Sequence, residues 1–203
     1  MSDPVRSTSK RCFDLIAVTF GIIIISPFLL IIALAVKLSS RGPIIFQQIR
    51  SGLDCKPFTA YKFRTMVEGA ERIGLGYEVA KNDSRITKVG KFLRDTSLDE
   101  LPQLFNVFKG EMSLIGPRPT IPSEIAKFTE RQKMRQQAKP GMSGWAQVNG
   151  RNLLSWDEKI DLDIWYIENW SFLLDLKILW KTIFVLLKRD ELYGKDGISR
   201  AKS

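Results

Sequence analysis

The sequence predicts a membrane-associated α/β fold, and three features of its 203 residues support this assignment. A 22-residue run without a charge, residues 15–36, is long enough for a membrane helix, which needs about 20 such residues. Two β-branched and aromatic runs in the middle of the chain, separated by a turn-rich segment, predict a small β-hairpin. A C-terminal stretch with a wide apolar face and lysines along one edge is typical of an interfacial amphipathic helix.

The apolar run fits three kinds of segment. A cleaved signal peptide has an apolar core of about 7–15 residues, so this run is too long for one. A spanning helix and a re-entrant helix both fit its length. Ser26-Pro27 lies at the middle of the run, where proline removes a backbone hydrogen bond and kinks a helix. Basic residues stand on both sides of the run, and a re-entrant helix would keep both sets on the cytoplasmic side. The residues alone leave spanning and re-entrant helices open.

The middle of the chain predicts mixed strands and helices. Ile44–Arg50 and Phe58–Met66 have strand patterns, and the period of two places Lys62 and Arg64 on one face of the second strand. Helical spacing follows Ser84, a candidate N-cap, and recurs from about residue 98 to Lys109-Gly110, a typical helix end.

The chain beyond these elements has a less regular pattern. Residues 122–137 predict a polar, exposed helix, and residues 139–152 a glycine-punctuated loop. The C-terminal interfacial helix covers about residues 170–187. We expect three parts: residues 1–40 as the membrane helix and its flanks, residues 41–189 as the catalytic domain, and residues 190–203 as a polar tail.

The composition excludes several kinds of chemistry. The chain contains no histidine, which removes imidazole acid–base catalysis and imidazole metal ligands. Its two cysteines, Cys12 and Cys55, are too few for a disulfide framework or a zinc cluster. The net charge of +9 suits anionic partners, but no nucleic-acid-binding motif is present. Any chemistry must therefore use carboxylates, amines, guanidiniums, hydroxyls or a bound metal ion.

Two adjacent carboxylates, Asp99 and Glu100, carry the most informative pattern, and two interpretations of them compete. Ser97 and Glu100 have the spacing of a capping box, and acidic residues in a first turn offset the helix dipole. The same position keeps a carboxylate ionised, and an ionised aspartate can attack phosphorus while its neighbour holds Mg²⁺. Local pattern alone favours capping.

Cations gather around this pair in the sequence. Arg94 precedes it, Lys62 approaches from the predicted strand, and Arg118 follows between Pro117 and Pro119. Arginine binds phosphate through a bidentate fork, and flanking prolines restrict the backbone that presents it. A solvated basic face, or one that contacts anionic lipid headgroups, is the alternative.

The ordered motifs resemble the bacterial sugar transferases, the monotopic phosphoglycosyl transferases of which the small PglC-like enzymes are the minimal form. The resemblance covers about residues 10–189 and rests on five segments in order. These are Ser26-Pro27, YKFRTM at 61–66, SLDELPQ at 97–103, GPRP at 116–119, and KPG at 139–141 with GWAQVNGR at 144–151.

The resemblance implies a monotopic enzyme with a re-entrant helix-break-helix at its N-terminus and an active site on the cytoplasmic face of the bacterial inner membrane. It would move a sugar-1-phosphate from a UDP-sugar to polyprenyl phosphate, here undecaprenyl phosphate, and release UMP. Asp99 would form a covalent phosphosugar intermediate, and Asp99 and Glu100 would bind Mg²⁺. Lys62, Arg94 and Arg151, together with Pro117-Arg118-Pro119, would lie near the substrate phosphates. Such an enzyme acts at the first membrane step of glycan or glycoconjugate assembly, before downstream glycosyltransferases.

Two alternatives remain as interpretations of the whole chain. A non-catalytic, membrane-bound basic scaffold would explain the anchor and the lysines, but not the acidic pair among phosphate-compatible cations. A polytopic transferase without a covalent intermediate would need several long apolar runs, and this sequence has one.

Overall fold

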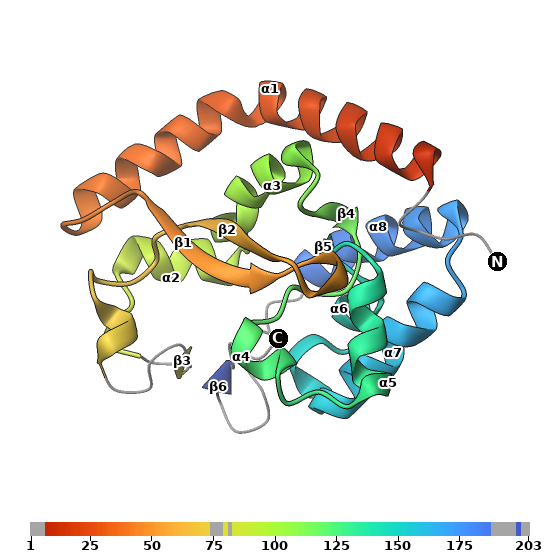
Figure 1. The fold of residues 1–203 in the computed structure, drawn as a ribbon. Coiled ribbons are helices and arrows are strands. Elements are labelled where there is room, and N and C mark those ends of the chain that lie inside the picture. Colours follow the sequence, from red (N-terminus) through yellow and green to blue (C-terminus); the bar gives the residue numbers. More distant parts are fainter. Residues whose placement is uncertain (1–6, 74–78, 81–82, 188–197, 200–203) are drawn as a thin grey trace.

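The protein is a mixed helix and sheet structure in which one long helix arches over the rest of the chain (Figure 1). The computed structural model describes residues 7–73, 79–80, 83–187 and 198–199. Beneath the long helix lie a β-hairpin and short helices, with the C-terminal helices at one end (Figure 1). The architecture agrees with the predicted α/β class.

The long helix α1, Thr8–Ser39, is continuous for 32 residues. Pro27 cannot donate to the carbonyl of Ile23, four residues before it. The hydroxyl of Ser26 donates to that carbonyl at 2.9 Å and so replaces the missing donor. The predicted break of the helix at Ser26-Pro27 is therefore wrong. The serine binds the carbonyl that the proline leaves without a donor, and α1 curves but continues through this point (Figure 1).

The hairpin lies under the middle and the C-terminal half of α1. Strands β1, Ile45–Ser51, and β2, Pro57–Phe63, pair antiparallel with Ile45 opposite Phe63. A 3₁₀ turn, Leu53–Cys55, joins them, and Asp54 adopts a positive φ of 53° there. Both strands were predicted, with bounds that differ by one to three residues.

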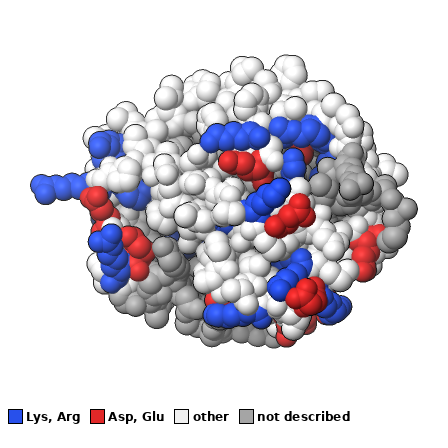
Figure 2. Space-filling view, viewed as in Figure 1, with Lys and Arg blue, Asp and Glu red and all other residues white. Residues whose placement is uncertain are grey.

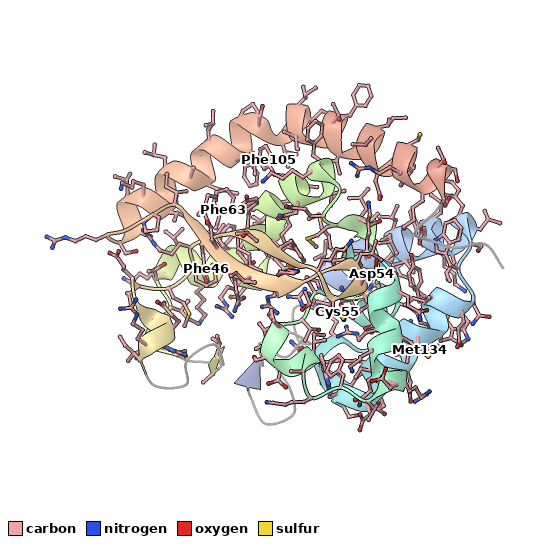
Figure 3. The ribbon with its side chains drawn as sticks, in the orientation of Figure 1. Phe46, Asp54, Cys55, Phe63, Phe105 and Met134 are labelled. Atoms are coloured by element: carbon pink, nitrogen blue, oxygen red, sulfur yellow. The ribbon has the colours of Figure 1, made fainter. Side chains whose placement is uncertain are left out.

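The inner face of α1 packs on this layer through two apolar clusters. Val18 contacts a cluster that includes Phe58 and Val107, while Ile32 and Val36 contact one that includes Phe63. Figure 3 shows Phe63 and Phe105 in the layer beneath the helix. The outer face is exposed and apolar, and the surface over α1 in Figure 2 carries almost no charged side chain. By length and composition, α1 is the one helix in the described part of the chain that could cross a membrane.

The segment after β2 forms a loop and a short helix. It contains the 3₁₀ turn η2, Ala70–Arg72, the strand β3, Val79–Ala80, and helix α2, Lys88–Asp95. Thr87 caps α2 by accepting from the N–H of Gly90 at 2.9 Å, so the predicted cap at Ser84 is wrong. Strand β6, Ile198–Ser199, pairs with β3, and the other residues of the predicted polar tail lie outside the described residues.

The predicted helix after residue 97 has two parts. A 3₁₀ helix η3, Leu98–Gln103, leads into α3, Leu104–Lys109, which ends at Gly110 with a φ of 85° as the sequence predicts. Strand β4, Ser113–Ile115, then pairs in parallel with β5, Gly141–Ser143. The predicted loop at 139–152 therefore contains a strand, and also the short helices α6, Trp145–Val148, and η5, Arg151–Leu153.

The predicted exposed helix at 122–137 is wrong. The chain forms α4, Pro122–Ile125, then α5, Glu130–Lys133, then a 3₁₀ turn η4, Met134–Gln137. Thr129 starts a new helix with its own capping box, and Arg135 is buried. The polar composition concealed this burial because a charged residue has a low prior for the interior.

Two longer helices follow: α7, Trp156–Glu168, and α8, Phe172–Leu187. Asp175 and Ile178 face the interior, while Leu173, Trp180 and Leu187 are 76%, 64% and 75% exposed. The predicted amphipathic C-terminal helix is thus present, and its outer apolar face is exposed among the described residues.

Candidate active site

A cavity of about 430 Å³ lies between the hairpin, the η3 turn and the C-terminal helices. It brings together residues from segments that are far apart in the sequence. Six predicted site residues line it: Lys62, Arg94, Asp99, Glu100, Arg118 and Arg151. The volume lies within the usual range of small-molecule sites.

Glu100 is held by two cations. Its Oε1 accepts from Lys62 Nζ at 2.6 Å and from Arg118 Nη2 at 2.6 Å, and its Oε2 accepts from Arg118 Nη1 at 3.2 Å. Burial acts to raise the pKa of Glu100, but the charges of Arg118 and Lys62 outweigh it and hold that pKa well below its usual range. Glu100 is therefore a fixed anion that orients both cations.

Asp99 differs sharply from its neighbour. Within the described part of the chain, its carboxylate makes no hydrogen bond or ion pair, although Lys62, Arg94 and Arg118 act on its charge. Burial and the charge of Glu100 raise the pKa of Asp99 to about 6, against the opposing effect of those cations. Asp99 is thus an ionised carboxylate at neutral pH whose oxygens face a cationic cavity.

The capping interpretation of this turn is wrong. Ser97 precedes η3 with a positive φ of 57°, and its side chain caps no backbone N–H. Its hydroxyl instead accepts from Arg151 Nη2 at 3.5 Å, and Glu100 turns to Lys62 and Arg118. Both side chains of the supposed capping box therefore serve tertiary contacts in the cavity.

Two buried arginines hold the loop that presents Arg118. Pro117 and Pro119 lack an N–H, so the loop has few donors and is fixed through its acceptors. Arg50 Nη1 donates to the carbonyl of Pro119 at 3.0 Å, and Arg135 Nη2 donates to the carbonyl of Arg118 at 3.1 Å. Neither arginine was identified from the sequence, because no local motif marks them and their partners are distant in the chain.

Asp163 supplies the counter-charge for Arg135. Its Oδ2 accepts from Arg135 Nη2 at 2.6 Å and from Nε at 3.1 Å, and each residue of the pair is 2% exposed. Burial raises the pKa of Asp163, and the charge of Arg135 opposes that shift. Asp161, two residues earlier, pairs with Arg131 at the surface.

Among the other predicted residues, Arg94 lies in the cavity lining, whereas Ser26 and Pro27 lie away from it. Arg94 is fixed by a 3.3 Å hydrogen bond from its Nη1 to Thr65 Oγ1. Arg64 also lines the cavity, but its guanidinium donates to carbonyls at the C-terminal end of α1, those of Val36 at 3.2 Å and Ser40 at 2.7 Å. Ser26 and Pro27 lie in α1 and do not line the cavity.

The acidic pair offers limited ligands for a metal ion. Among the described residues, no three acidic or cysteine side chains form a cluster that could hold one. Asp99 offers a free carboxylate, and Oε2 of Glu100 accepts only the longer bond from Arg118. Mg²⁺ commonly takes one or two carboxylates and completes its shell with water and substrate phosphate, so this donor set fits it.

Comparisons with known proteins identify the family of the chain. The family model described as bacterial sugar transferase matches residues 5–189. The sugar transferase EpsL of Bacillus subtilis is 48% identical over 86% of this chain and 85% of its own length. UDP-glucose:undecaprenyl-phosphate glucose-1-phosphate transferase of Klebsiella pneumoniae is 46% identical over 89% of this chain, which spans 40% of that relative. The exopolysaccharide production protein ExoY of Sinorhizobium fredii is 37% identical over 89% of this chain and 86% of its own length.

Proposed function

Because this chain belongs to the bacterial sugar transferase family, we propose that it is a phosphoglycosyl transferase that moves a sugar-1-phosphate from a UDP-sugar to undecaprenyl phosphate and releases UMP. Relatives are named as transferases of glucose-1-phosphate and as a galactose phosphotransferase. The observation that carries the proposal is the division of roles within the acidic pair. Glu100 is bound by two cations, while Asp99 makes no such bond and faces the cavity.

The reaction proceeds in two displacements at one phosphorus atom. In the first, an oxygen of Asp99 attacks the β-phosphorus of the UDP-sugar, and the bond from that phosphorus to the bridging oxygen breaks. UMP leaves with the electron pair, and the phosphosugar stays on Asp99 as an acyl phosphate. In the second, an oxygen of undecaprenyl phosphate attacks the same phosphorus and the bond to Asp99 breaks.

The cations of the cavity stabilise charge on the phosphoryl oxygens during both displacements. Lys62 and Arg118 are oriented by Glu100, and Arg94 is oriented by Thr65. Arg151 lines the cavity next to Ser97. Asp99 and Oε2 of Glu100 would hold Mg²⁺, which supplies further positive charge to the diphosphate when it is bound.

We place the enzyme on the cytoplasmic face of the inner membrane, with α1 as a re-entrant helix in one leaflet. Both ends of α1 are tied to the same protein body. Near the N-terminal end, Lys10 forms a buried ion pair with Asp175 at 2.5 Å, and at the C-terminal end Arg64 binds the carbonyls of Val36 and Ser40. A spanning arrangement would have to separate one of these contacts from the body, so the contacts support re-entrance and a monotopic enzyme.

The chemistry is tested by incubating the purified full-length protein with Mg²⁺ and a panel of UDP-sugars before any lipid is added. We expect release of UMP with the preferred sugar and a mass increase of one phosphosugar per protein. Asp99→Asn should abolish both signals, and Glu130→Gln, which removes an exposed carboxylate, should leave both unchanged. Normal turnover in Asp99→Asn would refute the assignment of Asp99 as the nucleophile. Absence of UMP release from every UDP-sugar would favour the non-catalytic scaffold.

The topology is tested by cysteine accessibility. Cys12 and Cys55 are exposed and would first be replaced by serine. Single cysteines at Ser2, which precedes α1, and at the exposed Arg41, which follows it, then report the two sides of α1 to a membrane-impermeant reagent in sealed inverted vesicles. Labelling of both positions supports the re-entrant helix, whereas labelling of only one would show a spanning helix.

A further inference from the structure

The two membrane-facing helices differ in their relation to the catalytic cavity. Within the described residues, α1 contributes no side chain to the cavity lining, although it is the longest apolar element. Helix α8 contributes three, Thr182, Val185 and Leu186. Of the two exposed apolar helices, α8 is therefore the one that also forms part of the wall of the cavity.

Helix α8 presents adjacent faces to three environments. Its inner face is fixed to the body, because Ile178 is fully buried and Thr182 Oγ1 hydrogen-bonds Ser143 Oγ at 2.6 Å. Its outer face exposes Trp180 and Leu187. Leu186, which is 43% exposed, lies between these faces and borders the cavity. An apolar path thus runs from the outer surface of α8 into the cavity.

Another part of the cavity lining has the reverse chemistry. Lys62 and Arg118 lie there beside Asp99, so that part suits a phosphate. Next to α8 the wall also contains the apolar side chain of Val148, which packs in the same cluster as Ile178. A molecule that fits both parts of the lining has a phosphate head and a hydrocarbon tail.

We infer that the isoprenoid chain of the lipid acceptor enters the cavity over the C-terminal half of α8, next to α6, and that α1 anchors the enzyme without guiding this substrate. The inference rests on the proposed function and adds the path of the acceptor. The phosphate of the acceptor meets Lys62 and Arg118, while its first isoprene units contact Leu186, Val185 and Val148. The rest of the chain lies in the leaflet beyond Leu186 and makes no defined contact with Leu187.

Two adjacent leucines provide a matched test in nanodiscs. Leu186 lines the cavity, whereas Leu187 is 75% exposed and does not line it. We expect Leu186→Asn to raise the KM for undecaprenyl phosphate about tenfold, because burying one leucine side chain is worth roughly this factor in binding. Leu187→Asn should change that KM less than twofold. Release of UMP before lipid addition should be equal in both variants and the wild type, which shows that the fold and the first displacement are intact.

A photolabelling experiment tests lipid binding without a sugar donor. It therefore distinguishes failure of the proposed lipid path from failure of the proposed reaction. Undecaprenyl phosphate that carries a diazirine on an early isoprene unit is photolysed with the full-length protein in nanodiscs. We expect the label on peptides from residues 182–187 or 145–148, with competition by unlabelled undecaprenyl phosphate. Competed label confined to α1, or equal KM values for the two leucine variants, would overturn the inference. Failure to release UMP together with competed labelling of α8 would reject the proposed reaction and retain the lipid path.

Discussion

We expect two aspartates on α7 to differ strongly in how much stability the protein loses when each is neutralised. Asp163 is 2% exposed and is bound twice by Arg135, which is itself 2% exposed. Asp161 pairs with Arg131 at 2.7 Å, but the two side chains are 54% and 67% exposed. Replacing each aspartate by asparagine removes one charge from the same helix, so each variant is the control for the other.

The expected magnitudes follow from burial. Removing one partner of a buried ion pair costs about 3–5 kcal/mol, because the other charge is left without compensation. Asparagine keeps one acceptor oxygen, so we expect Asp163→Asn to lower the free energy of unfolding by about 3 kcal/mol. A surface pair contributes about 0–1 kcal/mol, so Asp161→Asn should cost at most that. For a chain of this size, about 3 kcal/mol corresponds to a fall in Tm of roughly 6–12 °C.

The assay is thermal unfolding in detergent, followed by tryptophan fluorescence, together with UMP release at a temperature where all variants are folded. Arg135 also donates to the carbonyl of Arg118, so Asp163→Asn should lower kcat for UMP release as well as Tm. The double variant Asp163→Leu with Arg135→Met should recover most of the stability, because it removes both charges, but not the activity. Equal falls in Tm for the Asp161 and Asp163 variants would refute the reasoning.

Three further predictions concern other parts of the fold. Gly90→Ala should lower the free energy of unfolding by about 1–3 kcal/mol, because its Cβ would lie 1.8 Å from a backbone carbonyl oxygen. Gly21→Ala, whose Cβ would meet nothing within 4 Å, should leave Tm nearly unchanged in the same measurement. Pro27→Ala restores a helix N–H donor and should straighten α1, measured as a longer distance between spin labels at its two ends; an unchanged distance would show that packing sets the curve. Hydrogen bonds from Arg85 lower the pKa of Asp83 to about 2, so the stability it provides is complete above about pH 4 and is lost as pH falls towards 2. Hydrogen exchange at residues 70–73, whose carbonyls Arg85 binds, should therefore differ between the wild type and Asp83→Asn at pH 5 and converge near pH 2, and a constant difference would contradict this.

Elements with strong local signals were predictable. The hairpin strands follow from their β-branched and aromatic pattern, and the end of α3 follows from Lys109-Gly110, because a glycine adopts the left-handed conformation there. The continuity of α1 was not predictable from proline alone. It depends on one hydroxyl, that of Ser26, which finds the free carbonyl only once the helix has formed.

The site was predictable only where its residues carry a motif. Asp99, Glu100 and Arg118 stand in ordered motifs, and the structure places them around one cavity. Arg135 and Arg50 act through backbone carbonyls of a loop that is distant in sequence, so no spacing along the chain indicates them. Capping was the favoured local interpretation of Ser97 and Glu100, and it failed because tertiary cations compete for the same oxygens.

The arrangement of charge also supports the proposed displacement by Asp99, because the sequence contains no histidine that could act as a base. Burial and Glu100 would together tend to keep Asp99 protonated, but three cations oppose them and leave its pKa at about 6. At neutral pH the carboxylate is therefore ionised and needs no base to activate it, unlike a serine or cysteine nucleophile. The cations that keep Asp99 ionised are also those that would bind the incoming diphosphate, whose charge they balance. Replacing any one of these cations should thus weaken phosphate binding and raise the pKa of Asp99 together, so we expect the losses from two such replacements to be coupled and not additive.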